Sequence, residues 1–208
     1  LVSGTIGDYA AIVVGKGSPI NSMDDLMAAF DADPAGTPFG GGSVPGGMDH
    51  LVAAMVMEAS GRDALGVNYI PYDAGGTAMA ALLSGEIAAL STGFSEAIAL
   101  ADAGEVKIIG ITAPERVASY ADAPTMMEQG IDAEFVNWRG FFAAPGLPAD
   151  KLAAYQDAIA KMYETEEWET VRAQNGWVNI YNNGDDFLSF LENQEQVIGD
   201  LMRELGFL

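Results

Sequence analysis

A glycine-rich turn placed directly before an apolar stretch is the segment of this sequence best suited to hold a small molecule. Residues 40–47 read Gly-Gly-Gly-Ser-Val-Pro-Gly-Gly, and an apolar stretch follows from Met48. Glycines at such a junction leave backbone N–H groups uncovered, and the first N–H groups of a helix attract anions. The candidate donors to a phosphate or a carboxylate are Gly42, Ser43, Gly46 and Gly47.

Two nucleotide-binding motifs do not fit this turn. A Walker loop requires a lysine that reaches the β and γ phosphates, and no lysine follows the turn. A dinucleotide fingerprint requires glycine or alanine where this chain has Pro45, so only a looser and weaker glycine spacing remains. The turn therefore favours a small anion such as a carboxylate.

Two further strand-to-helix turns repeat this composition. One reads YDAGGT over residues 72–77, and a weaker one reads STG over residues 91–93. For any single turn, tight chain reversal explains the glycines, but turns at one edge of a parallel sheet converge on one crevice. The candidates from these turns are Tyr72 as an aromatic wall, Gly75, Gly76, Thr77, Thr92 and Gly93.

Arg139 and His50 complete the set of candidate ligand contacts. Arg139 stands in an otherwise aromatic extended segment, where it either makes a bidentate contact to a carboxylate or pairs with an acidic neighbour. Catalysis would need Ser43 as nucleophile with His50 and Asp49, so a serine-dependent hydrolase or transferase remains the alternative. Asp49 is otherwise expected to be a helix-start charge that suits the helix dipole.

Composition excludes several classes of partner. Thirty acidic residues against nine basic ones give a net charge of -21, which disfavours nucleic acid and anionic membrane surfaces. The chain has no cysteine and one histidine, so no metal or other cofactor is expected. No apolar run approaches the roughly 20 residues that cross a bilayer, so direct membrane insertion is not expected either.

Strands and helices alternate through the first part of the chain, which predicts an α/β fold with a mostly parallel sheet flanked by helices. Short apolar runs bounded by glycine or proline predict strands at 9–15, 37–40, 67–70, 87–91 and 106–112. Amphipathic or capped stretches predict helices from Ser22 and over 48–60, 75–83, 95–103 and 124–129.

The character of the sequence changes after residue 134. An extended, aromatic segment covers 134–144, and long amphipathic helices are predicted at 149–163, 165–175 and 185–205, with one strand at 177–181. We expect a boundary between two lobes near 138–145. The strands at 9–15 and 134–144 would then run between these lobes.

Several short motifs follow one another along essentially the whole chain. They are GGMDHL (46–51), NYIPY (68–72), LLSGE (82–86), FSE (94–96), AGEVK (103–107), IGIT (109–112), APTMMEQG (123–130) and NWRG (137–140). Their order and spacing resemble the solute-binding receptors of tripartite tricarboxylate transporters, the extracytoplasmic family also called Bug proteins. NWRG most resembles the tricarboxylate branch.

The resemblance implies a two-lobed clamshell of the type II periplasmic binding protein kind. Such a protein closes on a small carboxylate, for example citrate, held largely by backbone amides and ordered water, and it catalyses nothing. The second lobe is expected to be complete at 16–137, with 1–15 and 138–208 as hinge strands and the C-terminal part of an incomplete first lobe. The implied partners are the ligand and the membrane subunits of the transporter.

Family members also have a signal peptide and further first-lobe residues that this chain lacks, so it is expected to be a fragment of an extracytoplasmic or periplasmic protein. Surface left uncovered in the partial lobe is expected to cause disorder, rearrangement or self-association. The apolar residues expected on that surface are Phe141, Phe142, Leu152 and Phe187.

Overall fold

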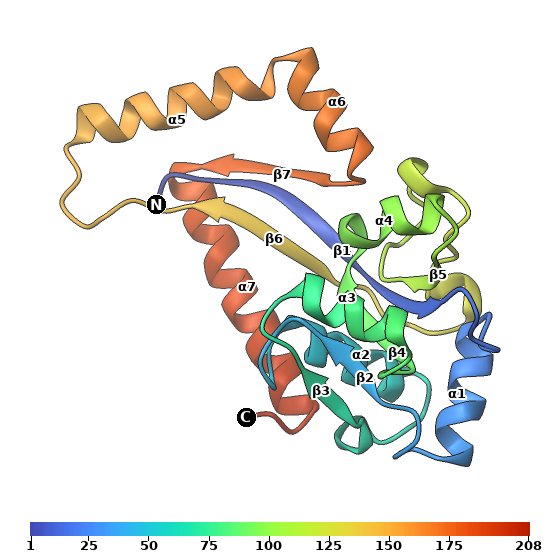
Figure 1. Cartoon of the computed structure of the whole chain (residues 1–208). Coiled ribbons are helices and arrows are strands. Elements are labelled where there is room, and N and C mark those ends of the chain that lie inside the picture. Colours follow the sequence, from blue (N-terminus) through green and yellow to red (C-terminus); the bar gives the residue numbers. More distant parts are fainter.

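One long strand organises the fold. The computed structural model describes residues 1–208, and its seven strands form one mixed sheet around β1 (Ser3–Gly15). The second half of β1 lies between β4 (Ala89–Gly93) and β5 (Val106–Ile111), and its first half lies between β6 (Val136–Phe141) and β7 (Val178–Asn183). Strand β1 therefore joins two regions of the sheet (Figure 1).

The larger region has the strand order β3-β2-β4-β1-β5. Strand β2 (Phe39–Gly41) is parallel to both β3 (Tyr69–Pro71) and β4, whereas β1 is antiparallel to β4 and β5. Strands β2, β3, β4 and β5 therefore all run in the same direction, as the prediction of a mainly parallel sheet requires. This prediction is wrong for β1, because this strand enters from the smaller region instead of through a strand-helix-strand crossover.

Side-chain alternation along β1 builds a core on each face of the larger region. Ile12 and Val14 belong to one buried cluster together with residues of α1 (Met23–Ala32) and α2 (Met48–Ala59). Ala11 and Val13 belong to a second cluster, with residues of α3 (Gly75–Ser84) and α4 (Phe94–Asp102). Successive strand residues point to opposite faces, so the apolar second half of β1, residues 10–14, is buried on both sides.

Local capping explains where the first helix begins. The N–H of Asp25 donates to Ser22 Oγ at 3.2 Å, and the N–H of Asn21 donates to the Asp25 carboxylate at 2.8 Å. Ser22 is thus the N-cap, as the predicted helix start requires, but Asp25 accepts from the residue before the cap and not from the N-cap N–H as in a regular capping box. Helices α2, α3 and α4 each follow one of the three glycine-bearing turns.

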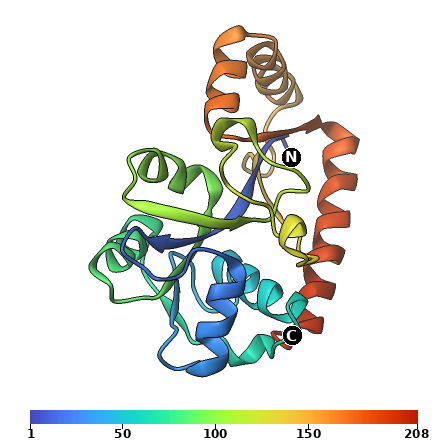
Figure 2. The ribbon, with the colours of Figure 1, turned by 90° about the vertical axis from the view of Figure 1, so that its right-hand side faces the viewer.

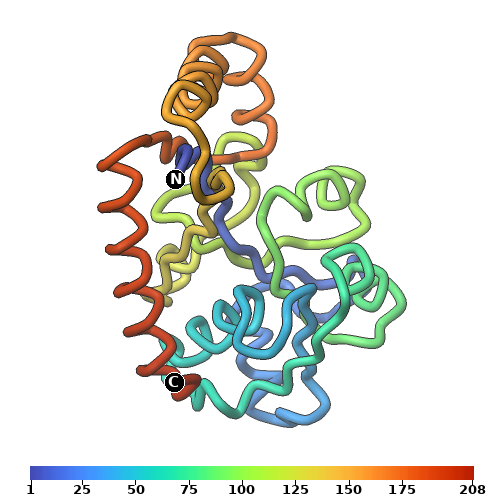
Figure 3. Tube along the Cα trace, turned by 90° about the vertical axis from the view of Figure 1, so that its left-hand side faces the viewer, coloured from blue at the N-terminus to red at the C-terminus, as the bar shows by residue number.

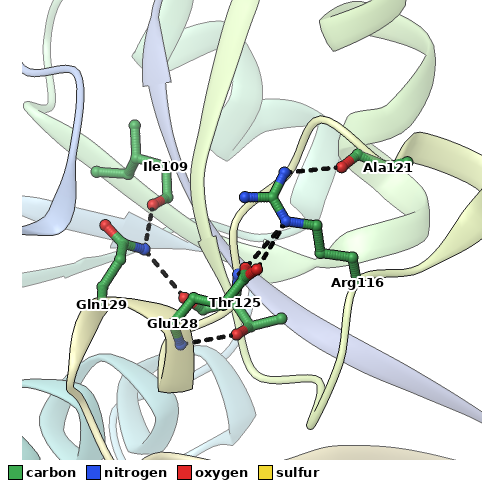
Figure 4. Close-up of polar contacts among 6 residues, drawn as sticks. All are labelled: Ile109, Arg116, Ala121, Thr125, Glu128 and Gln129. Atoms are coloured by element: carbon green, nitrogen blue, oxygen red, sulfur yellow. Dashed lines mark hydrogen bonds and ion pairs between the residues drawn. The ribbon is translucent and has the colours of Figure 1, made fainter.

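The chain between β5 and β6 is held by polar side chains instead of a regular helix (Figure 4). The predicted helix at 124–129 is reduced to a 3-10 turn at Met127–Gln129. The N–H of Thr125 donates to the Glu128 carboxylate at 2.8 Å, and Arg116 Nε donates to the same carboxylate at 2.9 Å. Gln129 Nε2 donates to the Ile109 carbonyl of β5 at 2.9 Å, which ties this segment to the sheet.

The C-terminal part contains α5 (Ala149–Tyr163), α6 (Glu166–Gln174) and α7 (Gly184–Glu204). Helices α5 and α6 extend beyond β7 and contain no buried residue (Figure 1). Helix α7 starts beside β7 and runs down one side of the molecule to the larger sheet region (Figures 2 and 3), where Leu205, just after the helix, packs against Leu51 and Ala54 of α2. The two sheet regions are therefore connected by α7 as well as by β1 and β6.

The residues expected to be uncovered divide into two groups. Phe141 and Phe142 are 56% and 58% exposed, as predicted, and Leu152 is half-buried. Phe187 is fully buried, so that prediction is wrong. The first turn of α7 places the Phe187 ring against the rings of Trp138 and Phe142, with centroids 6.4 and 5.7 Å away.

No helix of the structure combines the length and apolarity that crossing a bilayer requires.

Candidate ligand-binding site

The glycine-bearing turns meet at one edge of the larger sheet region. Strands β2 and β4 are parallel neighbours, so the turns that follow them emerge on the same side. A Cβ atom added to Gly42 would lie 2.3 Å from the backbone nitrogen of Gly75, which means that the first two turns touch backbone to backbone. Only glycine at position 42 permits this approach.

A pocket of about 200 Å³ lies where the turns meet. Its lining includes five residues that the sequence predicts as ligand contacts: Gly42, Ser43, Gly75, Gly93 and Arg139. The other lining residues, which the sequence did not suggest as ligand contacts, are Met48, Asp49, Glu96 and Asn137. A larger groove of about 550 Å³ lies elsewhere, but its apolar and aromatic lining offers no charged partner for a carboxylate.

Arg139 supplies the positive charge of the pocket. Six of the nine basic side chains form an ion pair, but Arg139 has no carboxylate within 4.0 Å. It projects from β6, which belongs to the smaller sheet region, whereas the turns belong to the larger one. An unpaired guanidinium keeps its planar set of donors available for a bidentate bond to a carboxylate.

Four predicted contacts from the second and third turns do not line the pocket. The Thr92 hydroxyl is buried and donates to Glu96 at 2.8 Å. The Thr77 hydroxyl donates to the carbonyl of Ala74 at 2.7 Å, and this bond caps the start of α3. Gly76 lies in the same first turn of α3 and is not among the pocket-lining residues. The Tyr72 hydroxyl donates to Glu86 at 2.8 Å, so this end of the ring is engaged elsewhere.

Three predicted contacts from the first turn are also engaged internally. The N–H of Gly46 donates to His50 Nδ1 at 3.1 Å, and the N–H of Gly47 donates to the carbonyl of Val44 at 2.8 Å. The His50 ring stacks on Tyr69 with a centroid distance of 4.5 Å, and burial lowers the His50 pKa. Gly46 and Gly47 instead line a separate groove beside the C-terminal end of the chain.

Asp49 lies directly against the first turn. Its own N–H donates to Ser43 Oγ at 3.0 Å, and a Cβ atom added to Gly41 would lie 3.0 Å from Asp49 Oδ2. Burial raises the Asp49 pKa to about 6, although polar groups of Gly42 and Ser43 act to lower it. Asp49 does lie at a helix start, as predicted, and it also lines the pocket.

Two more carboxylates lie close to the pocket. Glu96 lines it, and a Cβ atom added to Gly75 would lie 2.5 Å from Glu96 Oε2, so this carboxylate sits beside the start of α3. Asp8 is buried behind the pocket and accepts hydrogen bonds from the N–H and hydroxyl of Ser95 at 3.2 and 2.6 Å. Burial raises the Asp8 pKa, while the Ser95 hydrogen bonds and the Arg139 charge lower it.

The arrangement does not pair a serine nucleophile with a base. The Ser43 hydroxyl contacts Asp49 and lies 3.3 Å from the Tyr69 hydroxyl, whereas His50 Nδ1 accepts from Gly46. A Ser-His pair would require these two side chains to be within hydrogen-bond reach. No group of three or more His, Cys, Asp or Glu residues is arranged to hold a metal ion.

Comparison with known proteins identifies relatives along almost the whole chain. The sequence model of the tripartite tricarboxylate transporter family receptor, TctC, matches residues 2–207. A UPF0065 protein of Bordetella pertussis is 24% identical over 197 residues, which cover 90% of this chain and 57% of the relative. A UPF0065 protein of Cupriavidus necator is 24% identical over 196 residues, covering 94% and 58%. The chain thus spans a little over half the length of these relatives.

Solved structures show the same fold. The periplasmic binding protein BugD is similar with a TM-score of 0.88 and 20% identity, covering 99% of this chain and 68% of BugD. The R. palustris protein Rpa4515 with adipate has a TM-score of 0.89 and 19% identity, with coverage of 99% and 68%. MatC from Rhodopseudomonas palustris with bound malate has a TM-score of 0.80 and 17% identity, with coverage of 98% and 67%. Because the family model matches residues 2–207, the chain belongs to the tripartite tricarboxylate transporter receptor family.

Proposed function

We propose that this protein is an extracytoplasmic, periplasmic receptor that captures a small di- or tricarboxylate, such as citrate, for the membrane subunits of a tripartite tricarboxylate transporter. It binds its ligand without changing it chemically. The observation that carries the proposal is the convergence of the turns at Gly42, Gly75 and Gly93 on one pocket that also contains the unpaired Arg139. Family membership and the adipate and malate bound by two structural neighbours support the ligand class.

Local donors explain how a protein of charge -21 captures an anion. The first N–H groups of α3, at Gly75 and Gly76, have no acceptor within the protein, and they lie at the positive end of the helix dipole. Most acidic side chains are exposed, and salt screens their charge over a Debye length of about 8 Å. Short-range bonds to Gly75 and Arg139 therefore outweigh the distant net charge.

We also propose that the chain divides into two lobes that close on the ligand. Residues 16–137 would form one lobe, and residues 1–15 and 138–208 would supply hinge strands and part of the other. Arg139 lies beyond this boundary, whereas Gly42 and Gly75 lie within 16–137, so a ligand in the pocket contacts both parts. Such a ligand stabilises the closed state, which the transporter subunits would recognise.

Thermal melting and titration calorimetry test the proposal with citrate, malate and adipate as probes. A ligand that binds only the folded state raises the melting temperature, so at least one probe is expected to do so. Trimethyl citrate, which lacks the charges, is the control and should leave the melting temperature unchanged. The absence of binding by all three carboxylates at every pH tested would contradict the proposed function.

The Ser43→Ala variant tests whether the site is instead catalytic. Ser43 Oγ accepts from the N–H of Asp49 and does not contact His50, so Ser43→Ala should lower carboxylate affinity modestly and should not remove any enzymatic activity. Ester and thioester hydrolysis by the unaltered protein that disappears in Ser43→Ala would establish the serine-dependent alternative.

A further inference from the structure

Two side chains of opposite charge line the ligand pocket without pairing to each other. Arg139 reaches the pocket from β6 and Glu96 reaches it from α4, and both side chains are exposed. Neither of them forms an ion pair with any residue of the chain. A small molecule in this pocket therefore meets a cation and an anion that are both still available to it.

Glu96 is held next to the start of α3. Its Oε2 atom accepts a hydrogen bond from the Thr92 hydroxyl at 2.8 Å, and a Cβ atom added to Gly75 would lie 2.5 Å from the same oxygen. The other oxygen, Oε1, accepts no hydrogen bond from the protein. The N–H of Gly75 is free as well, so a ligand carboxylate bound there lies beside Glu96. The ligand group that adjoins this carboxylate comes close to a negative charge.

We infer that Glu96 determines ligand specificity, by selecting small carboxylates that carry an ammonium group beside a carboxylate, as 2-amino acids do. This inference rests on the proposed function, because it names the ligand class of the same pocket. The ligand carboxylate accepts from the N–H of Gly75, and the adjoining ammonium group donates to Glu96. A second carboxylate, where the ligand has one, bonds to Arg139. Each charge of the ligand then has a partner of opposite charge or a donor.

The other carboxylates near the pocket favour the same ligand class. Asp49 lines the pocket but is only 8% exposed, and Asp8 lies behind it and is 1% exposed, so Glu96 is the carboxylate that a ligand can reach. Together these three carboxylates outnumber the one guanidinium group of Arg139. Placing like charges side by side is unfavourable, so an ammonium group on the ligand gains more here than a further carboxylate does.

A purely structural role for Glu96 makes a different prediction. The bond between Thr92 and Glu96 ties down the first turn of α4, where a negative charge also suits the helix dipole. If this were its whole role, Glu96→Gln would change stability and leave the relative affinities of different ligands unchanged. The ratio of two dissociation constants therefore separates the two roles.

Calorimetry at about pH 7.5 with aspartate, malate and succinate provides the test. These probes share one carbon skeleton and carry an ammonium group, a hydroxyl group or a hydrogen atom beside the first carboxylate. Aspartate should bind about tenfold more tightly than succinate, with malate between them, and added salt should reduce the difference.

Two variants assign this preference to its residue. Glu96→Gln retains an oxygen that can accept from Thr92, and it should reduce the preference for aspartate to about threefold or less. Asp102→Asn is the matched control, because it removes an exposed carboxylate from the same helix, changes the net charge equally and does not line the pocket. This control should keep the full preference.

The order of affinities in the unaltered protein does not depend on any variant folding. Succinate binding as tightly as aspartate, or a preference for aspartate that survives in Glu96→Gln, would overturn this inference. The proposed function would remain intact in both cases, since the protein would still bind a small carboxylate. Failure of the unaltered protein to bind any of these probes, or citrate or adipate, would instead refute the proposed function.

Discussion

Arg139 is the residue whose removal should most directly weaken ligand binding. Its guanidinium lines the pocket without an internal carboxylate partner, so Arg139→Ala deletes a charged hydrogen-bond donor without breaking an ion pair. The expected loss is about 2–3 kcal/mol of binding free energy, measured by calorimetry with citrate, malate or adipate. Lys151→Ala is the matched control, because Lys151 also lacks an ion pair but does not line the pocket. An effect below about threefold at Arg139 would place it outside the binding site.

Asp49 should make folding stability depend on pH in the direction opposite to most carboxylates. Its pKa is about 6 in the folded protein against a model value of 3.8, so between these values the folded state holds a proton that the unfolded state has released. Stability contributed by Asp49 is therefore full below about pH 4, falls by up to about 3 kcal/mol as pH rises to about 6, and changes little above that.

Urea denaturation of the unaltered protein and of Asp49→Asn at about pH 4 and about pH 7 checks this linkage. The variant should lose relatively less stability between the two pH values, since an amide does not titrate. An identical change in both proteins would show that Asp49 is not the group responsible.

At the scale of the elements, the close contact between the turns before α2 and α3 should depend on Gly42 having no side chain. Gly42→Ala places a Cβ atom 2.3 Å from the nitrogen of Gly75, so the turns before α2 and α3 must separate. We expect a loss of about 1–3 kcal/mol in the free energy of unfolding, together with weaker carboxylate binding.

Gly76→Ala is the matched control for this element, because a Cβ atom there would meet nothing within 4 Å and the backbone N–H is retained. Chemical denaturation should show little or no destabilisation of this variant, and calorimetry should show unchanged affinity. Equal behaviour of the two variants would mean that contact between the turns does not shape the site.

For the whole molecule, an uncovered apolar groove should make the chain associate with a second copy of itself. The groove is lined by apolar and aromatic residues that include Phe141 and Phe142, both more than half exposed. Apolar surface of this kind is a common site of association. Light scattering after gel filtration should show a mass above 21.8 kDa that falls when Phe142 is replaced by serine.

Val197→Ser is the control for association, since Val197 is 52% exposed on α7 and does not line the groove. Its mass distribution should match that of the unaltered protein. A compact monomer at every concentration of the unaltered chain would contradict the self-association prediction.

The helices and most strands are predictable from the sequence because their signals are local. Ser22 and Asp25 cap α1, and the glycine turns precede α2 and α3, through contacts between residues close in the chain. The direction of β1 is not predictable in this way, because antiparallel pairing depends on which part of the molecule the strand comes from. The burial of Phe187 likewise depends on aromatic rings far away in the chain.

The sequence by itself determined the family, the positions of the turns and the presence of Arg139 in the segment that crosses between the sheet regions. Only the tertiary structure decided which donors are available to a ligand. Glycines show where N–H groups can be uncovered, but not which acceptors reach them. His50 and the Val44 carbonyl accept from Gly46 and Gly47 of the first turn, while Gly75 and Arg139 remain without an internal acceptor. A hydrogen bond depends on distances of a few tenths of an ångström between side chains, and that geometry is set only when the whole chain is packed.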